Sequence, residues 1–176
     1  FTDGYPRRMW SAQSIGGAFL AASAVAAAGI AAAPPADAGL QTWSGRWEMV
    51  NYASQKAGTS PASRQWESDY GGVFIVVTDC AKGRCVATAS GGPKPSNKTV
   101  PQPFRFNWSG SNWTTSFDWT WNCHLGDGPH KLLSPATSWV FYEPQPDGSL
   151  RGSWHTDIDS GPCRGSVIMP IAAFPR

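Results

Sequence analysis

The sequence predicts an all-β domain, an antiparallel up-and-down meander of eight or nine strands that closes, or nearly closes, into a barrel. Short runs of alternating apolar and polar residues are separated by Gly, Pro, Ser, Asn and Asp, and no helical period runs through residues 39–176. In the clearest run, Trp113–Cys123, the aromatic residues and Cys123 share one face. Strands joined in sequence leave two exposed sheet edges, which closure removes. A β-sandwich is the alternative.

Each predicted strand is a short run that ends at a turn signal. Ser109-Gly110-Ser111, Pro146-Asp147-Gly148 and Asp159-Ser160-Gly161-Pro162 contain the residues that tight turns prefer. Residues 91–101 and 125–135 are rich in Gly and Pro and are expected to form exposed loops. The predicted strands are Thr42–Asn51, Arg64–Tyr70, Gly72–Asp79, Arg84–Ala89, Pro103–Trp108, Trp113–Cys123, Thr137–Glu143, Leu150–Ile158 and Cys163–Ile171.

The N-terminal segment has the three parts of a bacterial export signal. Arg7 and Arg8 precede the apolar stretch Ser14–Ala33, which is followed by Ala36-Asp37-Ala38. Cleavage is expected between Ala38 and Gly39, which makes residues 1–38 a signal peptide and residues 39–176 a single domain. Alternatively Ser14–Ala33 stays as a signal anchor, because its 20 residues are long enough to cross a bilayer. Either way the domain is exported, to the cell envelope or the medium.

The four cysteines all lie in the predicted domain, and an even count in an exported chain indicates disulfides. Cys80 and Cys85 flank a Gly-containing loop between two apolar runs, so they are expected to face each other across a hairpin. The remaining pair is then Cys123–Cys163. With both pairs bridged, no thiol nucleophile is expected, and the spacing lacks the Cys-x-x-Cys pattern of zinc sites.

Nine of the ten tryptophans belong to the predicted domain. They either fill the barrel core or line a cavity, because indole rings pack well and also stack on flat or lipid-like ligands. The sequence does not separate these two roles. If a cavity exists, we expect it to bind a small apolar or amphipathic ligand such as an envelope lipid, without a cofactor. The expected ligand-binding residues are Trp43, Trp47, Trp113, Trp119, Trp121 and Trp154.

The search for catalytic chemistry yields one weak candidate. His155, Asp157 and Asp159 alternate, so on a strand they would project from one face and offer N and O ligands to a divalent metal in a metal-dependent hydrolase. The polar outer face of an ordinary half-buried strand explains the same pattern. The chain contains no Gly-x-Ser-x-Gly, Ser-x-x-Lys or His-Glu-x-x-His motif, so the sequence predicts a protein that is not an enzyme.

The net charge of +2 and the absence of a basic block argue against a nucleic-acid partner. If Ser14–Ala33 remains in the membrane, the alternative function is a tethered accessory subunit that docks on an envelope protein complex. This alternative predicts a solid barrel with an exposed aromatic patch.

The first predicted strand opens with Trp43-Ser44-Gly45-Arg46-Trp47, and its Gly-x-Trp resembles the start of lipocalin and avidin-type barrels. The resemblance implies that the Trp closes one end of the barrel and that a basic residue late in the chain packs over it. Arg164 is the residue expected to do so here. The chain has no convincing second lipocalin motif, so the resemblance bears on architecture rather than on a ligand.

Four segments together resemble conserved exported proteins of mycobacteria and related actinobacteria. The resemblance spans nearly the whole predicted domain and implies an actinobacterial envelope or secreted protein, but it transfers no catalytic residue. The segments are residues 43–47, residues 56–62, Thr78-Asp79-Cys80 with Cys85, and residues 147–154.

Overall fold

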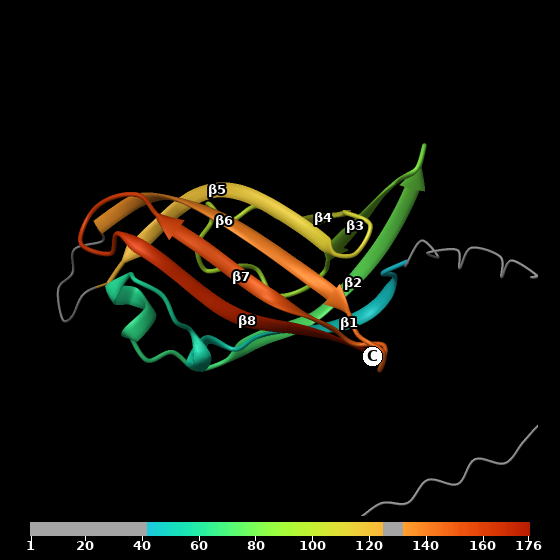
Figure 1. Ribbon diagram of the computed structural model, residues 1–176, viewed down its shortest axis with the longest axis horizontal. Helices are drawn as coiled ribbons and strands as arrows, with labels where there is room; N and C mark the ends of the chain where they lie inside the picture. Colours follow the sequence, from blue (N-terminus) through green and yellow to red (C-terminus); the bar gives the residue numbers. More distant parts are fainter. Residues whose placement is uncertain (1–41, 125–131) are drawn as a thin grey trace, which may run out of the picture. The chain divides into compact units, whose positions relative to one another are not determined.

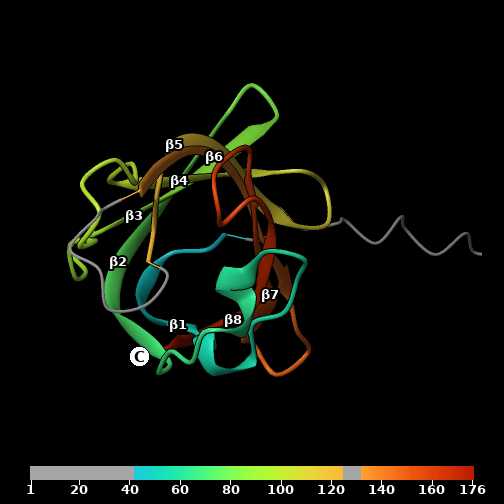
Figure 2. The same ribbon diagram turned by 90° about the vertical axis from the view of Figure 1, so that its left-hand side faces the viewer.

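The computed structural model describes residues 42–124 and 132–176, which form a closed antiparallel barrel of eight strands in sequence order (Figure 1). Seen along its axis, the ring is complete (Figure 2). This confirms the meander and the barrel, and the sandwich alternative is wrong. The strands are β1 Gly45–Asn51, β2 Tyr70–Ala81, β3 Arg84–Ser90, β4 Phe104–Trp108, β5 Trp113–Cys123, β6 Leu132–Pro144, β7 Leu150–Ile158 and β8 Gly165–Pro175.

The alternation read from the sequence appears as alternating burial along the strands. On β6, the even-numbered residues from Ser134 to Tyr142 are buried and face the interior, while Trp139 and Phe141 are exposed. Such alternation is the mark of a sheet with one face in the core and one in solvent. Every second residue along a strand such as β6 therefore faces the barrel interior, as the alternation in the sequence predicts.

One predicted strand, Arg64–Tyr70, is wrong except for its last residue, which begins β2. The chain instead forms two 3-10 turns, Ala53–Gln55 and Pro61–Arg64. Pro61 is the first residue of the second 3-10 turn, and the fixed φ of proline suits the start of a helix. The Ser60 hydroxyl caps this turn by accepting a hydrogen bond from the amide of Ala62 at 3.1 Å. Only Arg64 of the predicted strand belongs to this turn, and residues 65–69 form no strand.

The β1–β2 connection continues the pairing of β1 along the same edge of β8. Ala57 and Ile168 form an isolated antiparallel bridge, with backbone hydrogen bonds of 2.9 and 2.7 Å. Gly58 has φ +139°, and a Cβ there would lie 2.1 Å from the carbonyl oxygen of Ser166. Only glycine allows this close approach. The connection is therefore fixed to the barrel wall.

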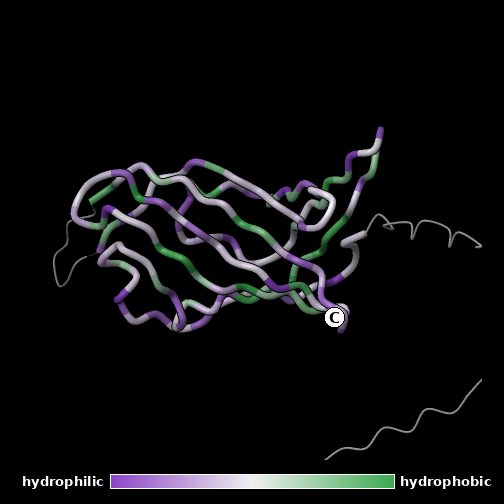
Figure 3. Tube along the Cα trace, in the orientation of Figure 1, coloured by the Kyte–Doolittle hydropathy of each residue, from purple (hydrophilic) through white to green (hydrophobic). Residues whose placement is uncertain are grey.

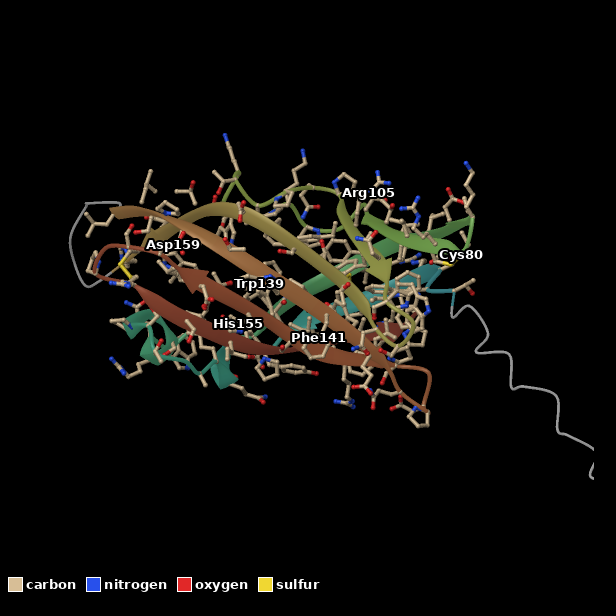
Figure 4. The ribbon with its side chains drawn as sticks, turned by 45° about the horizontal axis from the view of Figure 1, so that its top comes forward. Cys80, Arg105, Trp139, Phe141, His155 and Asp159 are labelled. Carbon is tan, nitrogen blue, oxygen red and sulfur yellow. A yellow bond between two sulfur atoms is a disulfide. The ribbon has the colours of Figure 1, made fainter. Side chains whose placement is uncertain are left out.

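Both predicted disulfides are present, at opposite ends of the barrel. Cys80–Cys85 joins β2 to β3 at the hairpin, and Cys123–Cys163 joins the end of β5 to the segment before β8. Figure 4 shows the first at Cys80 and the second near Asp159. Among the described residues, no helix is long and apolar enough to cross a membrane. The predicted signal or anchor segment lies outside the described residues.

Candidate functional site

The candidate site is a small pocket at the end of the barrel where β1 begins and β6 turns into β7. Its volume is about 160 Å³, which is close to that of cavities known to hold one benzene-sized ring. The lining residues come from the start of β1, from β5 and from the β6–β7 turn. They are Thr42, Trp43, Trp47, Trp113, Pro144, Gln145, Gly148, Ser149 and Leu150.

Trp43 is the centre of an aromatic cluster behind this pocket. Its ring centroid lies 5.0 Å from that of Phe106, 5.1 Å from that of Tyr142 and 6.0 Å from that of Trp113. These spacings are typical of favourable tilted and edge-to-face contacts. Trp43 is 2 % exposed. The cluster therefore holds the indole in a fixed position, and its surroundings leave little room for it to rotate.

The indole Nε1 of Trp43 is buried and has no hydrogen-bond partner among the described residues. The neighbouring indole of Trp47 is paired, since its Nε1 donates to the carbonyl oxygen of Ser44 at 3.1 Å. A buried donor left without an acceptor costs about 1–3 kcal/mol, and in native proteins such a group calls for an explanation. An acceptor supplied by a molecule in the pocket would provide one.

The β6–β7 turn forms a rigid rim to the pocket. Asp147 Oδ1 accepts hydrogen bonds from the backbone amide of Ser149 at 2.9 Å and from its hydroxyl at 2.6 Å. These bonds, the hydroxyl bond first, lower the pKa of Asp147 below its usual value, so the turn keeps its shape at neutral pH. Gly148 has φ +80°, a conformation that favours glycine. The rim is thus formed before any ligand arrives.

Two other predicted ligand-binding tryptophans lie deeper in the barrel, and both are fully paired. Trp119 and Trp154 each donate their Nε1–H to the hydroxyl oxygen of Ser138, at 2.8 and 3.0 Å. Ser138 Oγ also lies 2.8 Å from Thr156 Oγ1. Since two indoles use both acceptor sites of Ser138, its own hydroxyl must donate to Thr156. This network uses every donor that the two rings offer.

The six predicted tryptophans therefore divide between two places. Trp43, Trp47 and Trp113 surround the pocket, whereas Trp119 and Trp154 meet at Ser138. Trp121 packs against Trp119, at a centroid distance of 5.4 Å. Ligand binding by any of the six stays a prediction.

The expectation for Arg164 is wrong. Trp47 pairs with Pro175 at the end of β8, while Arg164 precedes the start of β8 and so lies at the opposite end of the barrel. The basic residue near Trp47 is Arg176, whose amide donates to the carbonyl oxygen of Arg46 at 2.9 Å. Its guanidinium forms an ion pair with Glu48. Because β1 and β8 are antiparallel, the residues at the end of β8 lie next to Trp47, and those at its start do not.

The three residues considered for a metal site do not form one. His155 Nε2 and Asp157 Oδ1 are 2.8 Å apart on the outer face of β7, and no third ligand joins them. Within residues 42–124 and 132–176, no three His, Cys, Asp or Glu side chains are close enough together to hold a metal ion. Asp159, in the turn after β7, does not complete the pair (Figure 4). The pair is a polar contact on an exposed strand.

The outer wall also carries an apolar patch, which we call the β6–β8 patch and define as Trp139, Phe141 and Ile168. These residues are 45 %, 37 % and 38 % exposed. The β6–β7–β8 register aligns Trp139 with His155 and Ile168. Figure 4 shows Trp139 and Phe141 over β6, beside His155. Large exposed apolar side chains gathered on neighbouring strands can mark an interaction surface.

The chain matches no protein-family model and no curated protein. Among solved structures, it is similar in fold to the monomer form of the PknI sensor domain of M. tuberculosis, with 19 % sequence identity and a TM-score of 0.56 over 77 % of this chain and 88 % of that one. The dimer form of the same domain gives 21 % identity and a TM-score of 0.46 over 67 % and 84 %. At this identity the likeness to the monomer form shows a shared fold alone.

Sequence reasoning missed the part of the pocket that comes from the β6–β7 turn. Gln145, Ser149 and Leu150 line the pocket because the turn folds back beside the start of β1. The turn itself was visible as Pro146-Asp147-Gly148, but its position beside Trp43 depends on closure of the barrel. Ser138 was missed as well, because a lone serine on an alternating strand gives no signal for two indole donors.

Proposed function

We propose that this domain is an exported, non-enzymatic barrel that binds a small ligand in the pocket formed by Trp43, Trp47 and Trp113. The observation that carries the proposal is a pocket of about 160 Å³ lined by Trp43, whose Nε1–H is buried and has no partner among the described residues. A ligand that fits would have a compact apolar body, the size of one ring or the end of a lipid chain, and one hydrogen-bond acceptor. Sensor domains of the same fold make ligand recognition a reasonable role for this barrel.

Two features support export to an oxidising compartment. Both cysteine pairs are bridged, and disulfides persist mainly in secreted and envelope proteins. The N-terminal sequence has the composition of an export signal. The likeness in fold to a mycobacterial sensor domain agrees with the resemblance to mycobacterial exported proteins. We therefore place the barrel outside the cytoplasm, in the envelope or beyond it.

The ligand proposal is tested with a pair of probes that differ only in the acceptor. Cyclohexanone has a ring of suitable size and a carbonyl oxygen, while methylenecyclohexane has the same shape with a CH₂ group in place of that oxygen. Calorimetric titration of the domain should show saturable binding of cyclohexanone. Loss of one charge-neutral hydrogen bond predicts about five- to tenfold weaker binding of methylenecyclohexane.

Trp43→Phe keeps an aromatic ring and removes the donor, so it should abolish the preference for cyclohexanone. Trp66→Phe is the matched control, because Trp66 is 85 % exposed and lies outside the pocket lining. Equal affinity of the two probes for the unaltered protein would contradict the proposal. Binding of neither probe would contradict it as well.

The second candidate function, docking on an envelope protein, is favoured by the exposed β6–β8 patch. In this case Trp139→Ser should remove a co-purifying envelope protein from detergent extracts. Trp66→Ser, which removes an equally large exposed side chain elsewhere, should retain it. Retention of the same protein by both variants would exclude the β6–β8 patch as its docking surface.

A further inference from the structure

A second hollow, which we call the groove, lies on the outer wall of the barrel over β2, β3 and β4. Its volume is about 400 Å³. It shares no lining residue with the tryptophan pocket. The register places Val77, Thr88 and Arg105 side by side across the three strands, with Asp79 beside Val86 in the next row. Arg84 borders it at the end of β3 nearest the hairpin. The hollow therefore has charged sides and an apolar floor.

The two arginines of this groove have no carboxylate partner. Within the described residues, the ion pairs are Lys56–Glu67, His155–Asp157 and Arg176–Glu48, and none of them involves Arg84 or Arg105. Figure 4 shows Arg105 on this wall, on the same side as Cys80. Unpaired guanidinium groups are well suited to bind a carboxylate or phosphate, because their fixed donors match two oxygens at once.

The apolar part of the groove continues along β2. Val77, Ile75 and Val73 point outward and are 60 %, 45 % and 38 % exposed. They form a track about 13 Å long, at roughly 3.3 Å per strand residue. The middle of β2 stands out as a continuous apolar stretch (Figure 3). An acyl chain lying on this track would remove three β-branched side chains from water.

Asp79 limits the charge of the group that can bind. It is the one acidic residue in the lining, against Arg84 and Arg105, so the lining carries a net charge of 2 − 1 = +1. A head group with a single negative charge is neutralised by this balance. A dianion such as a phosphate monoester would leave one charge facing the Asp79 carboxylate, which is unfavourable at short range.

We propose that this groove binds a single-chain amphiphile with a carboxylate head, which Arg105 holds beside Val77 while the chain lies over Val77, Ile75 and Val73, and that Arg84 adds positive charge from the hairpin end of the groove. This site is independent of the tryptophan pocket, and the two can be tested separately. Three features define the ligand: a single negative charge, an apolar chain and monomeric presentation. Each of the three has its own probe.

The test is titration calorimetry of the whole chain with decanoate, below the concentration at which it forms micelles. Decanol has the chain without the charge, acetate has the charge without the chain, and decyl phosphate has a dianionic head. Decanoate should bind at least about tenfold more tightly than any of the three. Vesicles of phosphatidylglycerol in sedimentation assays should bind no more protein than phosphatidylcholine vesicles do.

Arg105→Gln should weaken decanoate binding by about tenfold, while Arg84→Gln and Val77→Ser should each weaken it less. Asp79→Asn should raise the affinity for decyl phosphate more than for decanoate. Arg151→Gln, on the outer face of β7, should leave decanoate binding unchanged, and circular dichroism checks that every variant folds. Unchanged decanoate binding in both arginine variants would overturn the proposal. Binding of acetate as tight as that of decanoate, or selective binding to the anionic vesicles, would overturn it too.

Discussion

The two ends of the barrel are closed in different ways. At the end defined by Cys123–Cys163, aliphatic residues and the disulfide fill the interior, with Trp119 and Trp121 packed against them, and the buried Ser60 hydroxyl donates to the carbonyl oxygen of Cys163 at 2.6 Å. At the other end, rings packed around Trp43 leave a pocket and one unpaired donor. The difference indicates that one end serves stability and that the other is free to serve recognition.

The largest expected effect comes from removing the bridge at the stable end. Replacing both Cys123 and Cys163 with Ala opens a loop with a sequence separation of 40, which should lower the free energy of unfolding by about 4 kcal/mol. Removal of Cys80–Cys85, with a separation of 5, should cost about 2 kcal/mol. Urea unfolding measures both. A larger loss of unfolding free energy on removal of Cys80–Cys85 than on removal of Cys123–Cys163 would contradict the view that the Cys123–Cys163 end is the one that serves stability.

Ser138→Ala tests whether the deeper tryptophans are structural. It removes the acceptor of two indole donors at once, so Trp119 and Trp154 should both be left unpaired at a cost of about 2–3 kcal/mol. The affinity for cyclohexanone should not change, because Ser138 does not line the pocket. Urea midpoints and calorimetry provide the two readouts. A change in affinity without a loss of stability would move the recognition site into the barrel interior.

The buried Tyr142 beside Trp43 predicts a loss of stability in alkali. Burial, and secondarily the charge of Tyr70, raise the pKa of Tyr142, and burial raises that of Tyr70 to about 12. Above pH 10 the unfolded chain loses these protons while the folded one keeps them. The free energy of unfolding should therefore fall as pH rises from 10, by about 1.4 kcal/mol per pH unit for the buried Tyr142, and by less for Tyr70, which is 47 % exposed.

Tyr142→Phe removes one of these groups, so its stability should fall less steeply with pH over the same interval. Urea unfolding at pH 8, 10 and 11 compares the two proteins. Identical slopes would show that Tyr142 ionises as readily in the folded chain as in the unfolded one.

The smallest expected effect on stability is that of Trp43→Phe. The smaller ring loses packing, but the substitution also removes a buried donor without a partner, and these two effects oppose each other. The free energy of unfolding should change by less than about 1 kcal/mol. A loss of several kcal/mol in urea unfolding would contradict this balance between lost packing and the removed donor.

The barrel and both disulfides follow from local features of the sequence. A period of two along Trp113–Cys123 and the glycine-containing turns are enough to predict strands in a meander, and the Gly-containing loop pairs Cys80 with Cys85. The Arg64–Tyr70 prediction was wrong because Glu67 and Asp69, whose alternation suggested a strand, contact the preceding segment: Glu67 pairs with Lys56, and Asp69 accepts a hydrogen bond from the amide of Ser54.

The sites depend on closure, which joins residues far apart in the sequence. The tryptophans were visible, but which of them would be paired depends on Ser138, across the sheet. The groove over β2–β4 needs the outward faces of three strands in register, so Arg84 and Arg105 appear in the sequence as ordinary charged residues.

Indole ¹⁵N–¹H correlation spectra, recorded during titration with cyclohexanone, test most directly whether recognition belongs to the Trp43 end. The Trp43 Nε1–H resonance should move to lower field as it gains an acceptor, while those of Trp119 and Trp154, already bonded to Ser138, stay in place. Movement of the Trp119 and Trp154 resonances with no change at Trp43 would contradict the claim that the ligand binds at the Trp43 end and that Trp119 and Trp154 serve stability.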